Sequence, residues 1–279
     1  MQNNNTPYLF DLKNDYAFKK VFGTPANEQL TLDILNVMLE KQLESKLVSV
    51  SFPNSEQQIS SSTGKTGRLD VICQDQQGNR YIIEMQRQQE EDFRERVQHY
   101  AATELANQLQ RGQTYSQLPS VILLAFLDFS LFPQHQHYIS HHSIREHQTG
   151  ENELKNLRFT FVDLPKFKQS IQGKPLASLT HQERLCKALK DASQLNKTDI
   201  DILTQNDPIM QQVLSQLETQ KWDNQERARY LQAERWDMDY HSSMAQARNK
   251  GRQEGRQDIL NALVRQGKLS QSEAQALRI

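Results

Sequence analysis

The sequence predicts an α/β protein with a mixed central sheet flanked by helices and a helical region at its C-terminal end. Two features support this. Between about residues 16 and 165, segments rich in β-branched and aromatic residues alternate with segments of helical periodicity, an order typical of α/β domains. After about Thr180 the segments are helical in pattern, with many charged residues and glutamines. We therefore expect an α/β core at residues 8–170 and a helical region at residues 171–279, mildly basic at its end.

The first elements of the core are two helices and a short strand. From Tyr16 to Leu43, apolar residues recur at steps of three and four, which predicts helix. The sequence Gly23-Thr24-Pro25 interrupts this pattern, so we expect two helices. Residues 47–52 then alternate between apolar and polar residues, as in a short strand.

A β-hairpin and a helix are predicted next. Residues 68–73 and 80–85 are rich in Val, Ile and Tyr, and the polar connection between them contains Gly78 and Asn79, two residue types favoured in turns. The pattern of residues 90–111 then indicates a helix, with Gly112 as its glycine cap.

The longest apolar run, residues 121–132, predicts a buried central strand. A helix needs about 20 apolar residues to span a bilayer, so we expect no membrane segment here. Residues 137–147 and 157–161 have the pattern of further strands, and Asp163-Leu164-Pro165 closes the core.

Charge and cysteine usage exclude several classes of function. A net charge of -1 argues against non-specific coating of nucleic acid, although residues 221–279 carry a local excess of 11 Lys and Arg over 8 Asp and Glu. Two cysteines, Cys73 and Cys186, are too few for a disulfide framework or a multi-cysteine zinc site. Because the N-terminal residues also lack the basic start and apolar core of a signal peptide, we expect a cytoplasmic protein.

Two carboxylates in the predicted hairpin are the first candidates for chemistry. Asp70 and Glu84 each lie inside an apolar run, where a buried carboxylate is costly unless it is paired or binds a metal. Carboxylates on neighbouring strands suit Mg²⁺, which takes one or two of them and keeps water or phosphate oxygens in its other positions. The alternative is that both side chains face solvent on a half-exposed hairpin, and their spacing alone does not choose between the two.

The hairpin also carries a resemblance to a known family. Asp70, followed 14 residues later by Glu84-Met85-Gln86, resembles the D…(D/E)xK signature of the PD-(D/E)XK nuclease superfamily. More narrowly, it resembles the transposase-like branch, the recombination-promoting nuclease (Rpn) family, in which the last motif position is often Gln. Further stretches resemble this family in the right order: residues 14–23, the helix residues Arg94, Arg96 and Tyr100, and residues 108–115, 161–167 and 250–256. The resemblance implies a restriction-endonuclease-like core.

The resemblance also implies roles for the motif residues. Asp70 and Glu84 match the positions that bind one or two Mg²⁺ ions, with the main-chain carbonyl of Met85 as a further ligand and Mn²⁺ as a possible substitute ion. Gln86 holds the position of the catalytic lysine. A neutral amide can hold a water molecule but cannot carry positive charge. Three explanations for the missing lysine stay open: activation by the metal alone is sufficient, another cation such as Lys19 or Lys20 reaches the site, or the activity is low.

Arginines close to the motif are candidates for contact with DNA phosphates. Arg87, Arg94 and Arg96 follow Gln86 closely, and guanidinium groups suit phosphate oxygens. They are equally suited to pair with the acidic residues at positions 90–92 and 95.

Five histidines form a dense group that a zinc site could explain: His135, His137, His141, His142 and His147. Their spacing is not that of a helical zinc site, so we favour a structural role for them.

These observations favour a Mg²⁺-dependent DNA endonuclease associated with recombination or mobile elements, with the C-terminal helices contributing to DNA contact or to a homo-oligomer. One alternative is a catalytically weakened nuclease-fold protein that binds DNA or a protein partner without cutting. Another is a helical adaptor built on residues 180–279.

Overall fold

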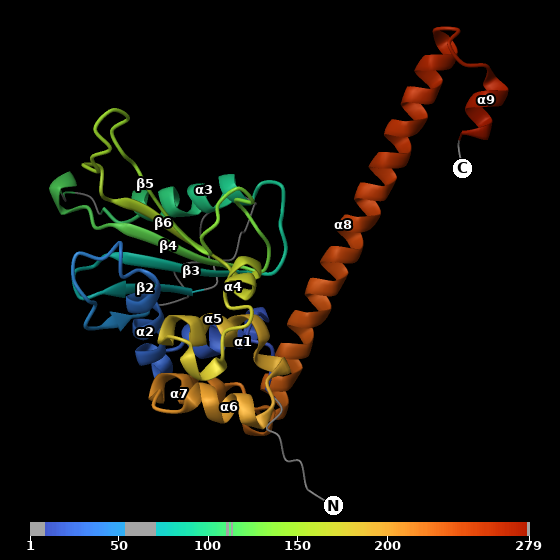
Figure 1. Ribbon diagram of the computed structural model, residues 1–279. Coiled ribbons are helices and arrows are strands. Elements are labelled where there is room, and N and C mark those ends of the chain that lie inside the picture. The colour runs from blue at the N-terminus through green and yellow to red at the C-terminus, as the bar shows by residue number, and fades with distance from the viewer. Residues whose placement is uncertain (1–8, 54–70, 110–111, 113, 278–279) are drawn as a thin grey trace, which may run out of the picture. The chain divides into compact units, whose positions relative to one another are not determined.

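The computed structural model describes residues 9–53, 71–109, 112 and 114–277 (Figure 1). The chain forms two compact units, residues 1–227 and 228–279. Asp70 and the start of the predicted strand at residues 68–73 lie outside the described residues.

The described part of the first unit is built on a mixed six-stranded sheet, as predicted. The strands are β1 (Val50–Ser51), β2 (Val71–Asp75), β3 (Arg80–Gln86), β4 (Val121–Leu127), β5 (Ile139–Ser143) and β6 (Leu157–Asp163). Their order across the sheet is β1-β2-β3-β4-β6-β5, in which β3, β4 and β6 run parallel and the other pairings are antiparallel. Every residue of β4 is buried, as expected for a central strand in a parallel arrangement.

The predicted hairpin joins β2 to β3 through a turn organised by Asp75. The Asp75 carboxylate accepts hydrogen bonds from the backbone N–H groups of Gln77 (2.8 Å) and Asn79 (3.0 Å) and from the hydroxyl of Tyr81 (2.9 Å). Gly78 has φ +84°, a conformation that a residue with a side chain adopts only with strain. The turn therefore sets the pairing in which Ile72 lies opposite Ile82.

Helices cover both faces of the sheet (Figure 1). On one side lie α1 (Asp15–Phe22) and α2 (Glu28–Met38), with the ring of Phe18 6.1 Å from that of Phe126 in β4. On the other side α3 (Phe93–Ala106) contributes Phe93, Val97 and Ala101 to a buried cluster with Ile82 and Leu123 of the sheet. The predicted helix at residues 90–111 is thus shorter at both ends, and Gly112 is not its cap, because the helix ends at Ala106 with Asn107 as the capping residue.

Four helices that follow the last strand, three of them in the predicted C-terminal region, belong to the same compact unit as the sheet. They are α4 (Leu164–Ser170), α5 (His181–Asp191), α6 (Lys197–Thr204) and α7 (Pro208–Gln216). Short 3₁₀ turns lie at Pro25–Asn27, Tyr115–Gln117, Leu176–Ser178, Ala192–Gln194 and Thr219–Lys221.

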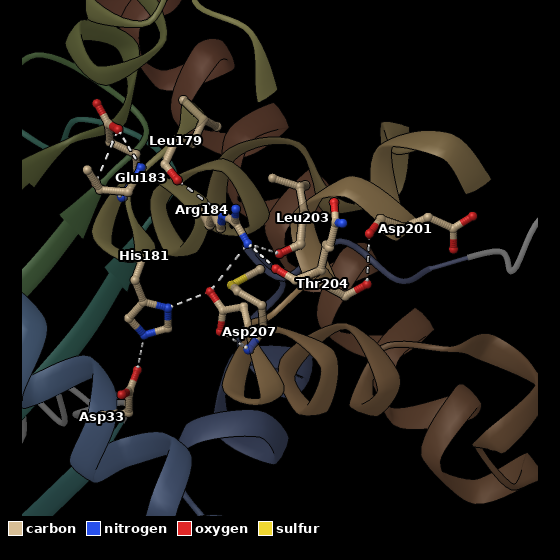
Figure 2. A network of polar contacts seen from close by, with 12 residues as sticks. Asp33, Leu179, His181, Glu183, Arg184, Asp201, Leu203, Thr204 and Asp207 are labelled. Atoms are coloured by element: carbon tan, nitrogen blue, oxygen red, sulfur yellow. Dashed lines mark hydrogen bonds and ion pairs between the residues drawn. The ribbon is translucent and has the colours of Figure 1, made fainter. Parts of the chain in front are cut away.

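An ionic network joins these helices to the core (Figure 2). The His181 ring, at the start of α5, lies 2.6 Å through Nε2 from Asp33 of α2 and 2.7 Å through Nδ1 from Asp207, which caps α7. Arg184 lies 3.9 Å from Asp207 and donates to the carbonyls of Leu203 and Gln205. One protonated ring therefore bridges three helices that are far apart in the sequence.

The second unit consists of most of the long helix α8 (Asn224–Arg265) and of α9 (Gln271–Ala276). Its buried apolar residues within the described part are Leu260 and Ala274. Among the helices described here, none is long and apolar enough to cross a membrane.

Candidate active site

The centre of the candidate site is Glu84, in the middle of β3. Its side chain is 7% exposed, so the alternative of a solvent-facing carboxylate on a half-exposed hairpin is wrong for this residue. Because side chains alternate along a strand, Glu84 shares a sheet face with Ile82 and Gln86. Ile82 packs in the cluster formed by α3, so Glu84 faces α3 and not α1.

The neighbouring parallel strands align with the motif residues in two rows. Glu84 is paired in register with Ala125 of β4, which is paired with Phe161 of β6. The next row on the same face is Gln86, Leu127 and Asp163, at the carboxyl ends of the three strands. Ligand sites of open α/β sheets lie at such strand ends. The small side chain of Ala125 leaves Glu84 without a bulky neighbour on β4.

Gln86 ends β3 and contacts the connection to α3. Its side-chain Nε2 donates to the carbonyl of Gln88 (3.2 Å) and to the carboxylate of Glu90 (3.3 Å). Its Oε1 accepts a hydrogen bond of 3.4 Å from the guanidinium of Arg96 on α3. The side-chain amide of Gln86 is therefore hydrogen-bonded to both the carboxylate of Glu90 and the guanidinium of Arg96.

Arg96 is held at this position by ionic and aromatic contacts. It forms an ion pair with Glu90, lies 4.0 Å from Asp92, and its guanidinium is 5.4 Å from the centre of the Phe93 ring. Partial burial acts against its charge, but the hydrogen bond and charge of Glu90 outweigh burial and raise the pKa of Arg96 further. Arg96 is therefore cationic at every pH of interest.

Tyr100 lies one helical turn beyond Arg96 on the same face of α3. Burial raises the pKa of its hydroxyl, Arg96 lowers it, and the carboxylates of Glu84 and Glu90 raise it further. Tyr100 is therefore neutral, and the charge of Glu84 is among those that act on its hydroxyl.

The lysines of α1 have partners of their own. Lys19 forms an ion pair with Asp15, one turn earlier on the same helix, and its catalytic role stays a prediction. Lys20 pairs with Glu226 and lies 5.2 Å from the centre of the Trp222 ring. Lys20 is thus bound at the segment that leads into α8.

The three candidate arginines have different surroundings. Arg94 donates to the carbonyl of Leu131 at 2.6 Å and lies 5.2 Å from the centre of the Phe132 ring, so it holds the segment that follows β4. Arg96 makes the pairing with acidic residues that the sequence left open. Arg87, directly after β3, stays a predicted phosphate contact.

Sequence reasoning did not identify Glu90 as a partner of Gln86. It placed Glu90 at the start of a helix, whereas α3 begins at Phe93 and residues 87–92 form a connection that turns back toward the end of β3. Glu90 is four residues from Gln86 in an irregular segment, so no periodicity in the sequence indicates this contact.

Two of the five histidines, His135 and His142, form an aromatic cluster with Phe132. The rings of His135 and His142 lie 5.1 and 4.9 Å from that of Phe132. Within the described residues, no three His, Cys, Asp or Glu side chains are arranged to hold a metal ion. Burial lowers the pKa of both His141 and His142, so these rings are neutral near pH 7.

The donor atoms at the motif fit a hard divalent cation. Glu84 would contribute carboxylate oxygens and Met85 a main-chain carbonyl, the ligand types that Mg²⁺ and Mn²⁺ prefer. At the described end of β2, Val71 is paired with Ile83 of the motif strand.

Together, the mixed sheet and the Glu84-Met85-Gln86 motif at the end of a central strand define an α/β protein with a restriction-endonuclease-like fold. The sequence model of one family, described as PD-(D/E)XK nuclease family transposase, matches residues 12–247. The chain therefore belongs to the PD-(D/E)XK nuclease family transposases. No curated protein and no solved structure matches it significantly.

Proposed function

We propose that the protein is a Mg²⁺-dependent DNA endonuclease that hydrolyses phosphodiester bonds and acts in recombination or in the movement of mobile elements. The observation that carries this proposal is the buried carboxylate of Glu84 at the motif position of a family that covers most of the chain. Glu84 is only 7% exposed on a central strand, and a carboxylate is the kind of ligand that Mg²⁺ takes in proteins.

The chain's own residues have distinct roles in this proposal. Asp70 and Glu84, with the carbonyl of Met85, would hold the ion. When bound, Mg²⁺ polarises the phosphate and lowers the pKa of a bound water molecule. Water adds its oxygen to phosphorus, the bond from phosphorus to one sugar oxygen breaks, and that oxygen takes up a proton. Gln86 orients the attacking water through its amide.

DNA contact in this proposal extends beyond the motif. Arg87 and Arg94 lie close to the motif in the sequence and are suited to phosphates flanking the cut. In the second unit the exposed basic residues Arg248 and Arg252, one turn apart on α8, suit the backbone further along the DNA or a second copy of the chain. Both cysteines are free and buried, as suits a protein acting in the reducing cytoplasm.

Cleavage of supercoiled plasmid tests the proposal. The wild type is expected to nick or linearise DNA with Mg²⁺ or Mn²⁺ and to stop with EDTA. Asp70→Asn and Glu84→Gln are expected to lose more than about 100-fold in rate, because loss of even an outer partner of a metal ligand costs about 10–100-fold. Glu104→Gln is the matched control, since it neutralises a carboxylate of α3 that pairs with Arg80.

An inactive wild type would overturn the proposal. If the protein bound DNA without cutting it in either metal, the function would be that of a catalytically weakened nuclease fold that recruits DNA or a protein partner. The neutral Gln86 is the residue that gives this alternative its weight.

A further inference from the structure

Gln86 leaves the motif without a cation, and this has a chemical consequence. During phosphodiester hydrolysis negative charge builds up on the phosphate oxygens, and a cation fixed nearby stabilises the transition state. A neutral amide offers hydrogen bonds only. If the protein cuts DNA as proposed above, either the metal carries this task alone or another side chain supplies the charge.

Arg96 is the cation that the described contacts bring to the motif. Its guanidinium donates to Gln86 Oε1 at 3.4 Å, and Gln86 is two residues from Glu84 on the same face of β3. Two residues along a strand span about 7 Å. The positive charge of Arg96 therefore lies beside Gln86, the residue at the position of the motif lysine, although Arg96 belongs to the neighbouring helix α3.

A DNA phosphate can replace Glu90 as the partner of Arg96. Arg96 and Glu90 have side chains 25% and 21% exposed, so solvent and an incoming phosphate can reach the pair. Glu90 lies in the irregular segment before α3, which tolerates movement better than a helix or strand does. A guanidinium can bind two oxygens of a phosphate at once, as it binds the two oxygens of a carboxylate.

A second arginine provides an internal comparison. Arg80, at the start of β3, forms an ion pair with Glu104 near the end of α3, so an arginine joins this strand to this helix here as well as at the ends where Arg96 contacts Gln86. Arg80 is six residues from Gln86, about 20 Å along the strand. If both arginines only hold β3 against α3, their substitution should have similar effects.

We propose that Arg96 is the catalytic cation of this site: Glu90 holds it in the DNA-free protein, and in the DNA complex its guanidinium binds the phosphate that is cut. Arg96 does not accept a proton from water, because a guanidinium stays charged. Its part is to stabilise charge on the phosphate and to fix the amide of Gln86. This inference rests on the proposed nuclease function and names the residue that compensates for the missing lysine.

Single-turnover cleavage with Mg²⁺, and DNA binding by fluorescence anisotropy in EDTA, test this assignment. Arg96→Gln is expected to slow cleavage by about 100- to 1,000-fold, the usual cost of removing one transition-state donor. Arg96→Lys should retain part of the rate, because it keeps the charge but not the planar fork. Arg80→Gln is the matched control and should cleave within about threefold of the wild type. Thermal unfolding of each variant verifies its fold.

A compensating substitution makes the test specific. Gln86→Lys in the Arg96→Gln background places a cation at the motif position again, so it should recover at least about tenfold of the lost rate. Glu90→Gln should tighten DNA binding several-fold, because it releases Arg96 from its carboxylate.

Three results would overturn the inference. They are an Arg96→Gln variant that cuts as fast as the wild type, equal losses for Arg96→Gln and Arg80→Gln, and no recovery on adding Gln86→Lys. With an active wild type, any of these leaves the nuclease function standing and directs attention to Lys19. A wild type that does not cut in any metal overturns the nuclease proposal itself.

Discussion

Among single residues, His181 has an unusually constrained environment. The hydrogen bond that the ring donates to the Asp33 carboxylate, followed by the one it donates to Asp207, raises the pKa of His181 to about 9 although burial opposes the charge. In the unfolded chain its pKa is about 6.5. The folded state therefore keeps a proton that the unfolded state loses between these two values, so the stabilising effect is complete below about pH 6.5 and declines as the pH rises through 9.

We predict from this that the free energy of unfolding falls by about 1–2 kcal/mol between pH 6.5 and 9.5, a figure already reduced for the ring's partial exposure. His181→Gln should be less stable than the wild type at pH 6.5 and should lack this fall. Urea unfolding at several pH values measures how the free energy of unfolding changes with pH in each of the two proteins. Parallel slopes for the two proteins would contradict the role given to His181.

The proposed metal ligands offer a second prediction at this scale. An ion that binds only the folded state stabilises it by RT ln(1 + [L]/Kd), about 1.4 kcal/mol at ten times the dissociation constant. Mg²⁺ should therefore raise the Tm of the wild type in the absence of DNA, and should not raise that of Glu84→Gln. Differential scanning fluorimetry across a Mg²⁺ series measures this. An equal rise in both proteins would place the bound ion away from Glu84.

At the scale of elements, the β2–β3 hairpin is the part on which the site depends most. Its turn is held by Asp75, which is 6% exposed and accepts bonds from the backbone and from Tyr81. The same strand pair sets the face on which Glu84 lies, because a slip of one residue would turn every side chain of β3 to the opposite face.

Asp75→Ala is accordingly predicted to destabilise the first unit by about 2–4 kcal/mol, since it removes several hydrogen bonds and leaves buried donors without an acceptor. Asp75→Asn keeps an acceptor and should cost less than half as much. Denaturant unfolding gives both values. A change below about 0.5 kcal/mol for Asp75→Ala would show that the pairing of the strands alone determines the turn.

At the scale of the whole molecule, the core lies almost entirely before residue 228. Within the described residues, the buried apolar side chains beyond this point are Leu260 and Ala274. The second unit instead exposes large apolar side chains on α8, among them Trp236 at 71% and Met238 at 63%. Exposed apolar residues of this size favour contact with another macromolecule.

Removal of residues 228–279 is therefore predicted to leave the main unfolding transition of the first unit within about 3 °C of the full chain, a change of about 1 kcal/mol. If α8 joins two copies of the chain, the full protein is a dimer or larger in light scattering and the shortened one is a monomer. If the full and the shortened protein are both monomers, the exposed apolar residues of α8 would instead serve contact with DNA or another partner.

Local sequence determined much of this protein. Alternation and turn residues placed the hairpin, the apolar run placed β4, and Gly23-Thr24-Pro25 separated α1 from α2. Each of these follows from residues near one another in the chain, because periodicity and turn preference are local properties.

Tertiary structure alone decided which side chains meet at the site and between the helices. The contact of Arg96 with Gln86, the hydrogen bond of Arg94 to Leu131 and the bridge from His181 to Asp33 join residues that are separated by between ten and about 150 positions. Such contacts depend on strand order and on which helix covers which face, and the packing of the whole sheet sets both. The motif Glu84-Met85-Gln86 was therefore recognisable in the sequence, whereas the contact between Gln86 and the cation Arg96 depends on the tertiary structure.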